Sequence, residues 1–245
     1  MRPVVKSSCP QDDFGRDIIF KKFQNARGEL IDRLGQYCSY CEMKLDSALA
    51  VEHIQPIHPE GVSADMQERK VCWDNFLLAC PNCNGTKNNI DVIPDDYLWP
   101  HKDNTFLALT YSEGGVIRVS ANLSDALKTK AHNTIRLTGL DKSPTTNPKL
   151  SNDPARSDRR WENRREVWNI ACDAKADLTG HDTPELRKSI ITAALGHAYW
   201  SIWMTVFKDD ADMCRRLIDA FVGTCRECFD EQQGFAPMPR LGGQI

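Results

Sequence analysis

The chain has 245 residues, of which 41% are hydrophobic and 27% are charged, and its net charge is −3. This composition is typical of a globular protein and excludes a largely disordered chain. The small negative charge gives no general attraction to nucleic acid, so contacts to phosphates would have to come from local basic patches or bound metal ions.

Ten cysteines would indicate disulfides in a secreted protein. Residues 1–6, however, lack the apolar core of a signal peptide, so we expect a cytoplasmic protein whose cysteines bind zinc. The longest weakly polar stretch, Ala193–Phe207, is shorter than the roughly 20 apolar residues that span a bilayer. We therefore expect no membrane segment.

Residues 1–36 are predicted to form an N-terminal arm and a helix. In Asp17–Leu34, apolar residues recur at helical spacing with charged residues between them. We expect this helix to pack as a scaffold on the segment that follows it.

Two Cys-x-x-Cys pairs come next, Cys38 with Cys41 and Cys80 with Cys83. Two such pairs several dozen residues apart can place four thiolates around one tetrahedral zinc ion. The sequence therefore predicts a structural Zn²⁺ that ties together the ends of one segment, residues 37–93. Cys72 has no paired partner and is predicted to be a buried thiol.

Between the two cysteine pairs, the sequence predicts two short strands. Ala48–Ile54 suits a strand that carries Glu52 and His53 at its end. Phe76–Ala79 is an apolar run short enough for a second, buried strand. Pro81 fits the first position of a helix, because its missing N–H costs nothing there.

These elements carry residues suited to phosphodiester hydrolysis, which requires an activated water and stabilisation of the phosphoryl oxygens. His53 is the natural general base near pH 7. Glu52 and Asn84 are suited to hold Mg²⁺ or Mn²⁺, a Lewis acid. Asn75 would hold the loop or orient His53. Lys87, one helical turn beyond Asn84, would reach a phosphate.

Each of these residues also has a structural alternative. Asn75 and Asn84 could cap the turn and the helix, and for Asn75 the structural role is favoured. Lys87 could be a solvated helix charge. The four cysteines could hold zinc in a binding module without catalysis, although the neighbouring Glu52 and His53 argue against this function.

The motifs Glu52-His53-x-x-Pro56, Trp73-Asp74-Asn75 and Cys80-x-x-Cys83-Asn84-x-x-Lys87 together resemble the zinc-bound HNH endonucleases. The resemblance implies a ββα-metal finger with His53 as the first motif residue and Asn75 as the second. Asn84 stands at the third motif position, where many members have His, and Glu52 stands where many members have Asp.

Residues 94–140 are predicted to form a hairpin and a helix. Phe106–Tyr111 and Val116–Ser120 suit two strands joined across Ser112–Gly115. Ser124–Leu137 suits a helix with a favourable first residue. Residues 141–158 contain three prolines and are predicted to be a linker, which makes them the best domain boundary.

Residues 159–245 are predicted to be a C-terminal helical domain with helices at Arg159–Ala176, Pro184–Lys208 and Ala211–Phe229. Five arginines fall between positions 156 and 165. They could bind nucleic acid or an acidic partner, but interleaved acidic residues favour an exposed helix surface with ion pairs. Cys225 and Cys228 are predicted to lie in the last helix, facing the core.

The pattern as a whole predicts an α+β protein that is mostly helical. Arg2-Pro3, the early helix and Thr134–Asp141 followed by an Arg-rich helix resemble PtuB, the HNH subunit of Septu-type antiphage systems. The resemblance implies a nuclease controlled by an ABC-type ATPase partner, PtuA-like, sometimes alongside a retron. It favours DNA as the substrate and leaves a specific RNA such as a tRNA open.

Overall fold

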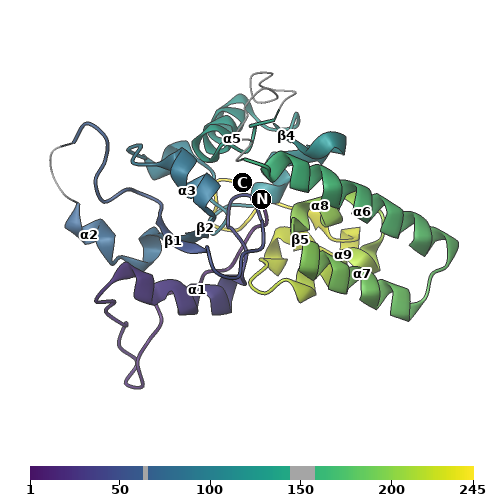
Figure 1. Ribbon diagram of the computed structural model, residues 1–245, viewed down its shortest axis with the longest axis horizontal. Coiled ribbons are helices and arrows are strands. Elements are labelled where there is room, and N and C mark those ends of the chain that lie inside the picture. Colours follow the sequence, from purple (N-terminus) through teal and green to yellow (C-terminus); the bar gives the residue numbers. More distant parts are fainter. Residues whose placement is uncertain (63–65, 144–157) are drawn as a thin grey trace.

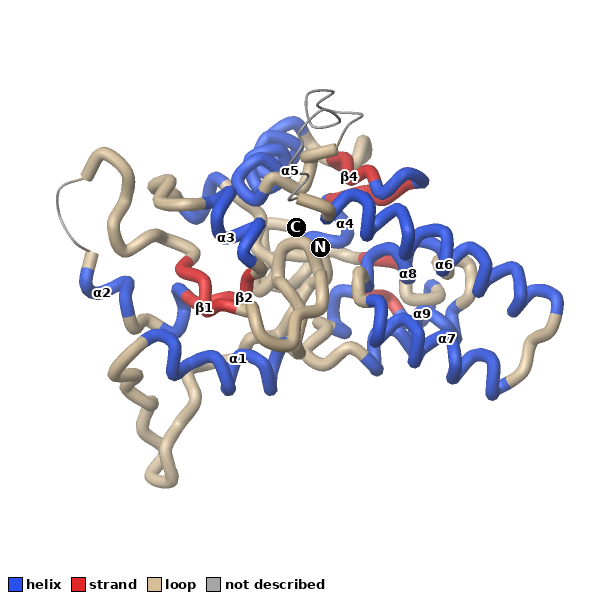
Figure 2. Tube along the Cα trace, viewed as in Figure 1, coloured by secondary structure: helices blue, strands red, loops and turns tan. Residues whose placement is uncertain are grey.

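The computed structural model describes residues 1–62, 66–143 and 158–245. Its fold is α+β and mostly helical, as predicted, with short strands among the helices (Figures 1 and 2). A small finger lies at one end of the molecule, and a group of helices lies at the other. Both marked chain ends lie between these two parts.

The finger follows the predicted order of strand, loop, strand and helix. Strand β1 (Ala50–His53) pairs antiparallel with β2 (Phe76–Ala79), so that His53 lies opposite Phe76. The short helix α2 (Gln67–Lys70) lies in the loop between them. Helix α3 (Pro81–Lys87) begins with its proline in the first turn, as expected.

The predicted N-terminal helix Asp17–Leu34 is too long. Helix α1 comprises only Arg27–Leu34, preceded by one 3-10 turn at Phe23–Ala26. The backbone N–H of Ile18 donates to the carbonyl oxygen of Pro10 over 2.8 Å, and this pairing holds the preceding residues in an extended arm. The apolar side chain of Ile19 is consequently 87% exposed.

The middle of the chain contains the predicted hairpin and helix. Strands β3 (Leu109–Ser112) and β4 (Val116–Val119) pair antiparallel, and α5 (Asp125–Thr138) follows with Ser124 as its N-cap. The first strand is shorter than predicted, because Thr105–Ala108 forms the helical turn α4, whose N-terminus is capped by the side chain of Asn104.

The C-terminal part begins with the long helix α6 (Arg160–Gly180). The predicted helix Pro184–Lys208 is wrong in one respect, because it is broken into α7 (Pro184–His197) and α8 (Trp200–Val206). Ala198 and Tyr199 at the break have φ angles of 64° and 54°. The Glu42 carboxylate accepts a hydrogen bond of 2.7 Å from the Ser201 N–H, so a residue of the finger caps the second helix.

The predicted last helix, Ala211–Phe229, is also too long, since α9 comprises only Ala211–Ala220. The chain then turns back toward its N-terminus, where Thr224 pairs with Val4. Cys225 and Cys228 are buried as predicted, but they lie at a turn before the short strands β5 (Phe229–Asp230) and β6 (Ala236–Pro237) and not in a helix.

The arginine-rich stretch is not the exposed, ion-paired surface that was predicted. The side chains of Arg160 and Arg164 are each 2% exposed. Arg164 donates to the carbonyl oxygens of Gly115 and Leu140, and Arg160 binds Thr138 and Gly139 in the same way. These arginines therefore hold α6 against the middle of the chain. Within the described residues, Arg159 shows the predicted exposed ion pair, with Glu162, and Arg165 is exposed too.

The buried apolar residues form one hydrophobic cluster to which residues 1–36, 37–93, 94–140 and 159–245 all contribute, for example through Leu30, Phe76, Leu109 and Trp200. The predicted linker lies mostly outside the described residues, so the division into domains stays a prediction. Within the described ranges, no helix has both the length and the apolar character needed to cross a membrane.

Candidate functional site

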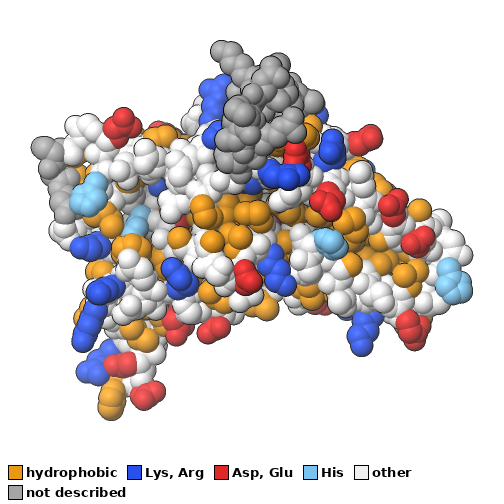
Figure 3. Space-filling view, in the orientation of Figure 1, with side chains coloured by type: hydrophobic (Ala, Val, Ile, Leu, Met, Phe, Trp, Pro, Cys, Tyr) orange, Lys and Arg blue, Asp and Glu red, His pale blue; other side chains and the backbone are white. Residues whose placement is uncertain are grey.

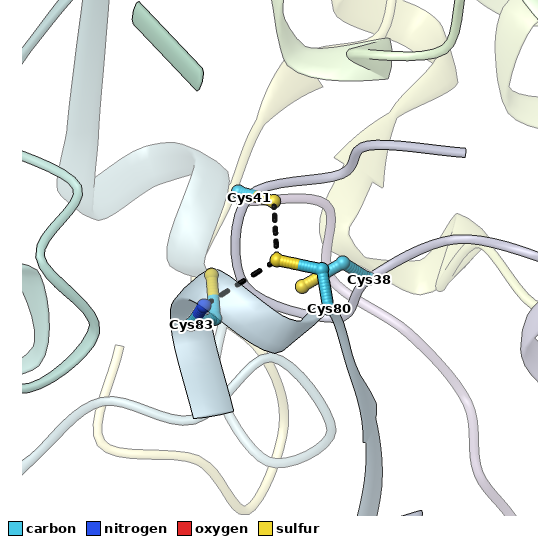
Figure 4. A group of neighbouring side chains, drawn as sticks. All are labelled: Cys38, Cys41, Cys80 and Cys83. Carbon is cyan, nitrogen blue, oxygen red and sulfur yellow. Dashed lines mark hydrogen bonds between the residues drawn. The ribbon is translucent and has the colours of Figure 1, made fainter. Parts of the chain in front are cut away.

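The four predicted zinc ligands come together at one point. Cys38 and Cys41 lie in a tight turn that follows α1, and Cys80 and Cys83 lie where β2 passes into α3. Their sulfur atoms are all within 4.8 Å of one another and turn inward (Figure 4). The Sγ atoms of Cys41 and Cys80 are 3.6 Å apart.

This geometry fits a tetrahedral zinc ion. Sulfurs that each lie about 2.3 Å from one tetrahedral zinc are about 3.8 Å apart, close to the observed separation. All four cysteines are buried, and hydrogen bonds from neighbouring thiols, Cys38 first, lower the pKa of Cys80. The cluster therefore offers the closed, sulfur-only coordination of a structural zinc site.

A cation from the C-terminal part supports this cluster. The Arg160 guanidinium donates a hydrogen bond of 2.9 Å to the Sγ of Cys83 and also pairs with Asp158. A zinc ion with four thiolates carries a net negative charge, which a buried guanidinium offsets. No sequence pattern indicated this contact, because the two residues are 77 positions apart.

A groove of about 390 Å³ lies beside the finger and collects the predicted catalytic residues. Glu52 and His53 reach it from β1, and Asn84 and Lys87 reach it from α3. The pairing of β1 with β2, whose end passes directly into α3, is what brings these two pairs of residues together. Asn75 is not among the residues that line the groove.

His53 is held in one orientation at the wall of this groove. Its ring packs edge-on against Phe23 and Phe76, with ring centres 4.7 and 5.2 Å apart, and its Nε2 lies 3.1 Å from the carbonyl oxygen of Lys70. Since a carbonyl only accepts, Nε2 carries the proton and the lone pair is on Nδ1. Burial lowers the pKa of His53. The ring is therefore neutral near pH 7, as a general base requires.

Glu52 and Lys87 form an ion pair that the sequence did not predict. Lys87 Nζ lies 2.9 Å from Glu52 Oε1, and the two side chains are 1% and 5% exposed. Lys87 also donates to the backbone carbonyl of His53 over 2.6 Å. The alternative of a solvated helix charge is therefore wrong. Lys87 instead ties α3 to both residues at the end of β1.

Asn75 has the structural role that was favoured. Its side-chain amide accepts from the Gln55 N–H at 2.7 Å and donates to the carbonyl oxygens of Gln55 and Arg69. It fixes the loop that carries Lys70, the residue that binds the His53 ring. Cys72, predicted to be a buried thiol, is exposed, because it lies between α2 and the Trp73–Asn75 turn at the surface.

Glu52 and Asn84 offer a carboxylate and an amide oxygen, the donors that Mg²⁺ or Mn²⁺ prefers. Both line the groove beside His53. The buried Glu52 Oε1 has Lys87 Nζ at 2.9 Å and no other polar partner in the described residues, so a further lone pair of this oxygen can accept a ligand. Burial raises the pKa of the Glu52 carboxyl group, whereas the positive charge of Lys87 lowers it. Glu52 and Asn84 therefore have the donor atoms to hold a divalent ion.

Two further ionisable residues of the groove lining, Arg27 and His58, had not been assigned a role from the sequence. Arg27, at the start of α1, is exposed, and His58 lies in the loop after β1. Lys and Arg side chains also gather over this end of the molecule (Figure 3). Lys21 and Lys22, just before the 3-10 turn at Phe23–Ala26, and Lys70, at the end of α2, are also exposed. Nothing in their local sequence distinguishes them from ordinary surface charges.

Residues 38–89 match the family model of the HNH endonucleases. The matched segment begins at the first zinc ligand and contains β1, β2, α3 and the groove residues contributed by them. No curated protein matches the chain. The finger is thus an HNH endonuclease domain with a four-cysteine cluster suited to zinc.

Proposed function

We propose that this protein is a metal-dependent endonuclease that hydrolyses phosphodiester bonds in nucleic acid, with His53 as the general base. The observation that carries the proposal is the neutral, oriented imidazole of His53 in one groove with Glu52 and Asn84. The match of residues 38–89 to the HNH endonucleases supports it.

The groove residues have separate tasks in this reaction. His53 Nδ1 takes the proton from the attacking water, and the contact with Lys70 keeps that nitrogen turned to its substrate. Glu52 and Asn84 would hold Mg²⁺ or Mn²⁺, which supplies Lewis-acid stabilisation of the phosphate charge. Lys87 positions Glu52 and the His53 backbone. Arg27 at the groove wall is suited to bind a neighbouring phosphate.

We further propose that the nuclease is the effector of an antiphage defence system and is controlled by an ABC-type ATPase partner. The resemblance of the chain to PtuB supports this proposal, and DNA is the favoured substrate. If it is correct, cleavage by the purified chain changes when a PtuA-like ATPase is added. Equal cleavage rates, with no complex in size-exclusion chromatography, would contradict it.

One observation favours a second candidate, a zinc-stabilised binding module without catalysis. The Glu52 carboxylate is already neutralised by Lys87, and a buried ion pair is also a common structural element. In that function the finger would present the groove to nucleic acid without cutting it.

Cleavage assays separate the two functions. Plasmid DNA and total RNA are incubated with Mg²⁺ or Mn²⁺ and either the wild type, His53→Ala or the control His181→Ala, an exposed histidine at the end of α6. All three proteins are matched for zinc content. We expect cleavage by the wild type and the control and at least a hundredfold loss in His53→Ala. Equal cleavage by all three, or no cleavage with the ATPase present, contradicts the nuclease.

A further inference from the structure

A second groove lies between β4 and α5, outside the segment that matches the HNH endonucleases. It has a volume of about 440 Å³ and an apolar floor formed by Ile117 and Ile135. Basic side chains surround this floor. They are contributed by Arg118 of β4 and by Lys128, His132 and Arg136 of α5. The helical spacing of the last three places them along one side of α5.

The arginines of this groove differ in their pairing from several arginines of the C-terminal part. Arg187, Arg215 and Arg226 each pair with carboxylates. Arg118 and Arg136 are exposed and have no carboxylate partner in the described residues. Their charges remain available to an anionic ligand.

The remaining charges of the groove do not cancel this positive potential. Lys128 contacts Asp125 at 3.5 Å, but that carboxylate is fully exposed and the pair is weak in water. Asp141 is the one acidic residue that the described lining contains, and Arg118, Lys128 and Arg136 outnumber it. A chain with a net charge of −3 thus concentrates several positive charges around one groove.

This second groove is connected to the catalytic groove through α3. Lys142, just after α5, donates to the Thr86 hydroxyl over 3.1 Å, so the end of α5 lies against α3. Asn84, two residues before Thr86, lines the catalytic groove. Residues two apart in a helix point to nearly opposite sides. One side of α3 thus faces the catalytic groove, and its other side contacts the segment that follows α5, the helix that lines the second groove.

We propose that the groove between β4 and α5 binds the sugar-phosphate backbone of the nucleic acid whose scissile phosphate lies at His53. Arg118 and Arg136 would bind phosphate oxygens, for which the planar guanidinium is suited, and the apolar floor would contact sugar or base. The proposal rests on the proposed nuclease function. It also supplies the phosphate contacts that Arg160 and Arg164, both buried, do not provide.

Binding is measured by fluorescence anisotropy with a labelled 30-base-pair duplex and the corresponding single strand, with Ca²⁺ in place of Mg²⁺, over a range of NaCl concentrations. The test variant is Arg118→Gln/Arg136→Gln, and the control is Arg215→Gln/Arg226→Gln, which removes equal charge from carboxylate-paired arginines. Each phosphate contact contributes about 0.7–0.9 to the slope of log affinity against log salt. We expect a slope lower by about 1.5 and a tenfold or larger loss of affinity in the test variant alone.

Hydrolysis of bis(p-nitrophenyl) phosphate, which is too small to reach the second groove, serves as the readout of the catalytic site, and the test variant should keep the wild-type rate. Wild-type affinity and salt slope in the test variant overturn the proposal, even if His53→Ala has lost all cleavage. Loss of affinity for the ATPase partner with unchanged nucleic-acid affinity also overturns it, since the groove would then bind protein. If the wild type cleaves nothing but the test variant binds weakly, the groove proposal stands and the nuclease function fails.

Discussion

Arg160 is the residue through which the C-terminal helices should control the stability of the zinc site. Its guanidinium reaches Cys83 Sγ at 2.9 Å, the carbonyl oxygens of Thr138 and Gly139 at 2.8 and 3.0 Å, and both oxygens of Asp158. The substitution Arg160→Met keeps most of the side-chain volume and removes all of these bonds. We therefore predict weaker zinc binding and a less stable fold.

The size of both effects follows from these contacts. A hydrogen bond to a charged group contributes about 1.5–3 kcal/mol, and about 1.4 kcal/mol changes a binding constant tenfold. Loss of the N–H···S bond should therefore weaken zinc binding about 10- to 100-fold, the range typical of residues that support metal ligands. Breaking a buried ion pair costs about 3–5 kcal/mol of unfolding free energy. We expect the lower end, because Asp158 is 22% exposed.

The assay is competition for zinc with a chromogenic chelator, together with the absorption spectrum of the Co²⁺-substituted protein. Arg159→Met is the matched control, since the neighbouring Arg159 is 68% exposed and pairs with Glu162 at the surface. Arg160→Lys keeps the charge and should lie between the wild type and Arg160→Met, which provides a folded variant if the latter is unstable. If Arg160→Met holds zinc as tightly as the Arg159→Met control, the reasoning is refuted.

Three further predictions concern buried ionisable side chains. Lys87→Met leaves the Glu52 carboxylate buried without its partner and should lower the unfolding free energy by about 3–5 kcal/mol. Urea titrations at pH 7 measure this loss, and Lys87→Met/Glu52→Gln should recover part of it. An unchanged midpoint would show that the ion pair does not contribute to stability. Burial lowers the pKa of His53, so this base stays deprotonated below the usual histidine pKa near 6.5. The acidic limb of the kcat/KM profile should therefore lie at a pH below 6.5. An acidic limb at or above pH 7 would contradict this assignment. Burial also lowers the pKa of His101 well below its usual value, and both of its ring nitrogens are buried without partners. The unfolded chain therefore binds a proton that the folded chain does not, and stability should fall below pH 6.5 by up to about 1.4 kcal/mol per pH unit, a dependence that His101→Phe should reduce.

Several parts of the fold and site could be predicted from sequence because they depend on neighbours in the chain. Cys-x-x-Cys spacing turns two sulfurs toward one point, so the sequence indicated the four cysteines that come together in a cluster suited to zinc. The second strand was predicted correctly from the apolar run Phe76–Ala79, and the start of α3 from the position of Pro81. The order of the HNH motifs then indicated which residues face one groove, and the structure places Glu52, His53 and Asn84 there.

The elements that could not be predicted are those in which a distant residue overrides a local preference. An apolar helical pattern did not show that the Pro10 carbonyl oxygen would hold Ile18 in an extended arm, or that Glu42 would cap a new helix at Ser201. The charge pattern of the sequence likewise does not distinguish a charged side chain in solvent from a buried one that is paired with an opposite charge.

In this protein, local sequence patterns are enough to indicate which sulfurs can hold zinc, which imidazole is suited to act as a base, and which short strands and helix present them. The role of each charge, in contrast, depends on contacts between distant parts of the chain. Lys87 and Arg160 are cations in an alternating charge pattern until packing removes them from water, and they then become the partners of Glu52 and Cys83. The physical reason is that a buried charge requires a specific partner, whereas a charge in the unfolded chain requires none.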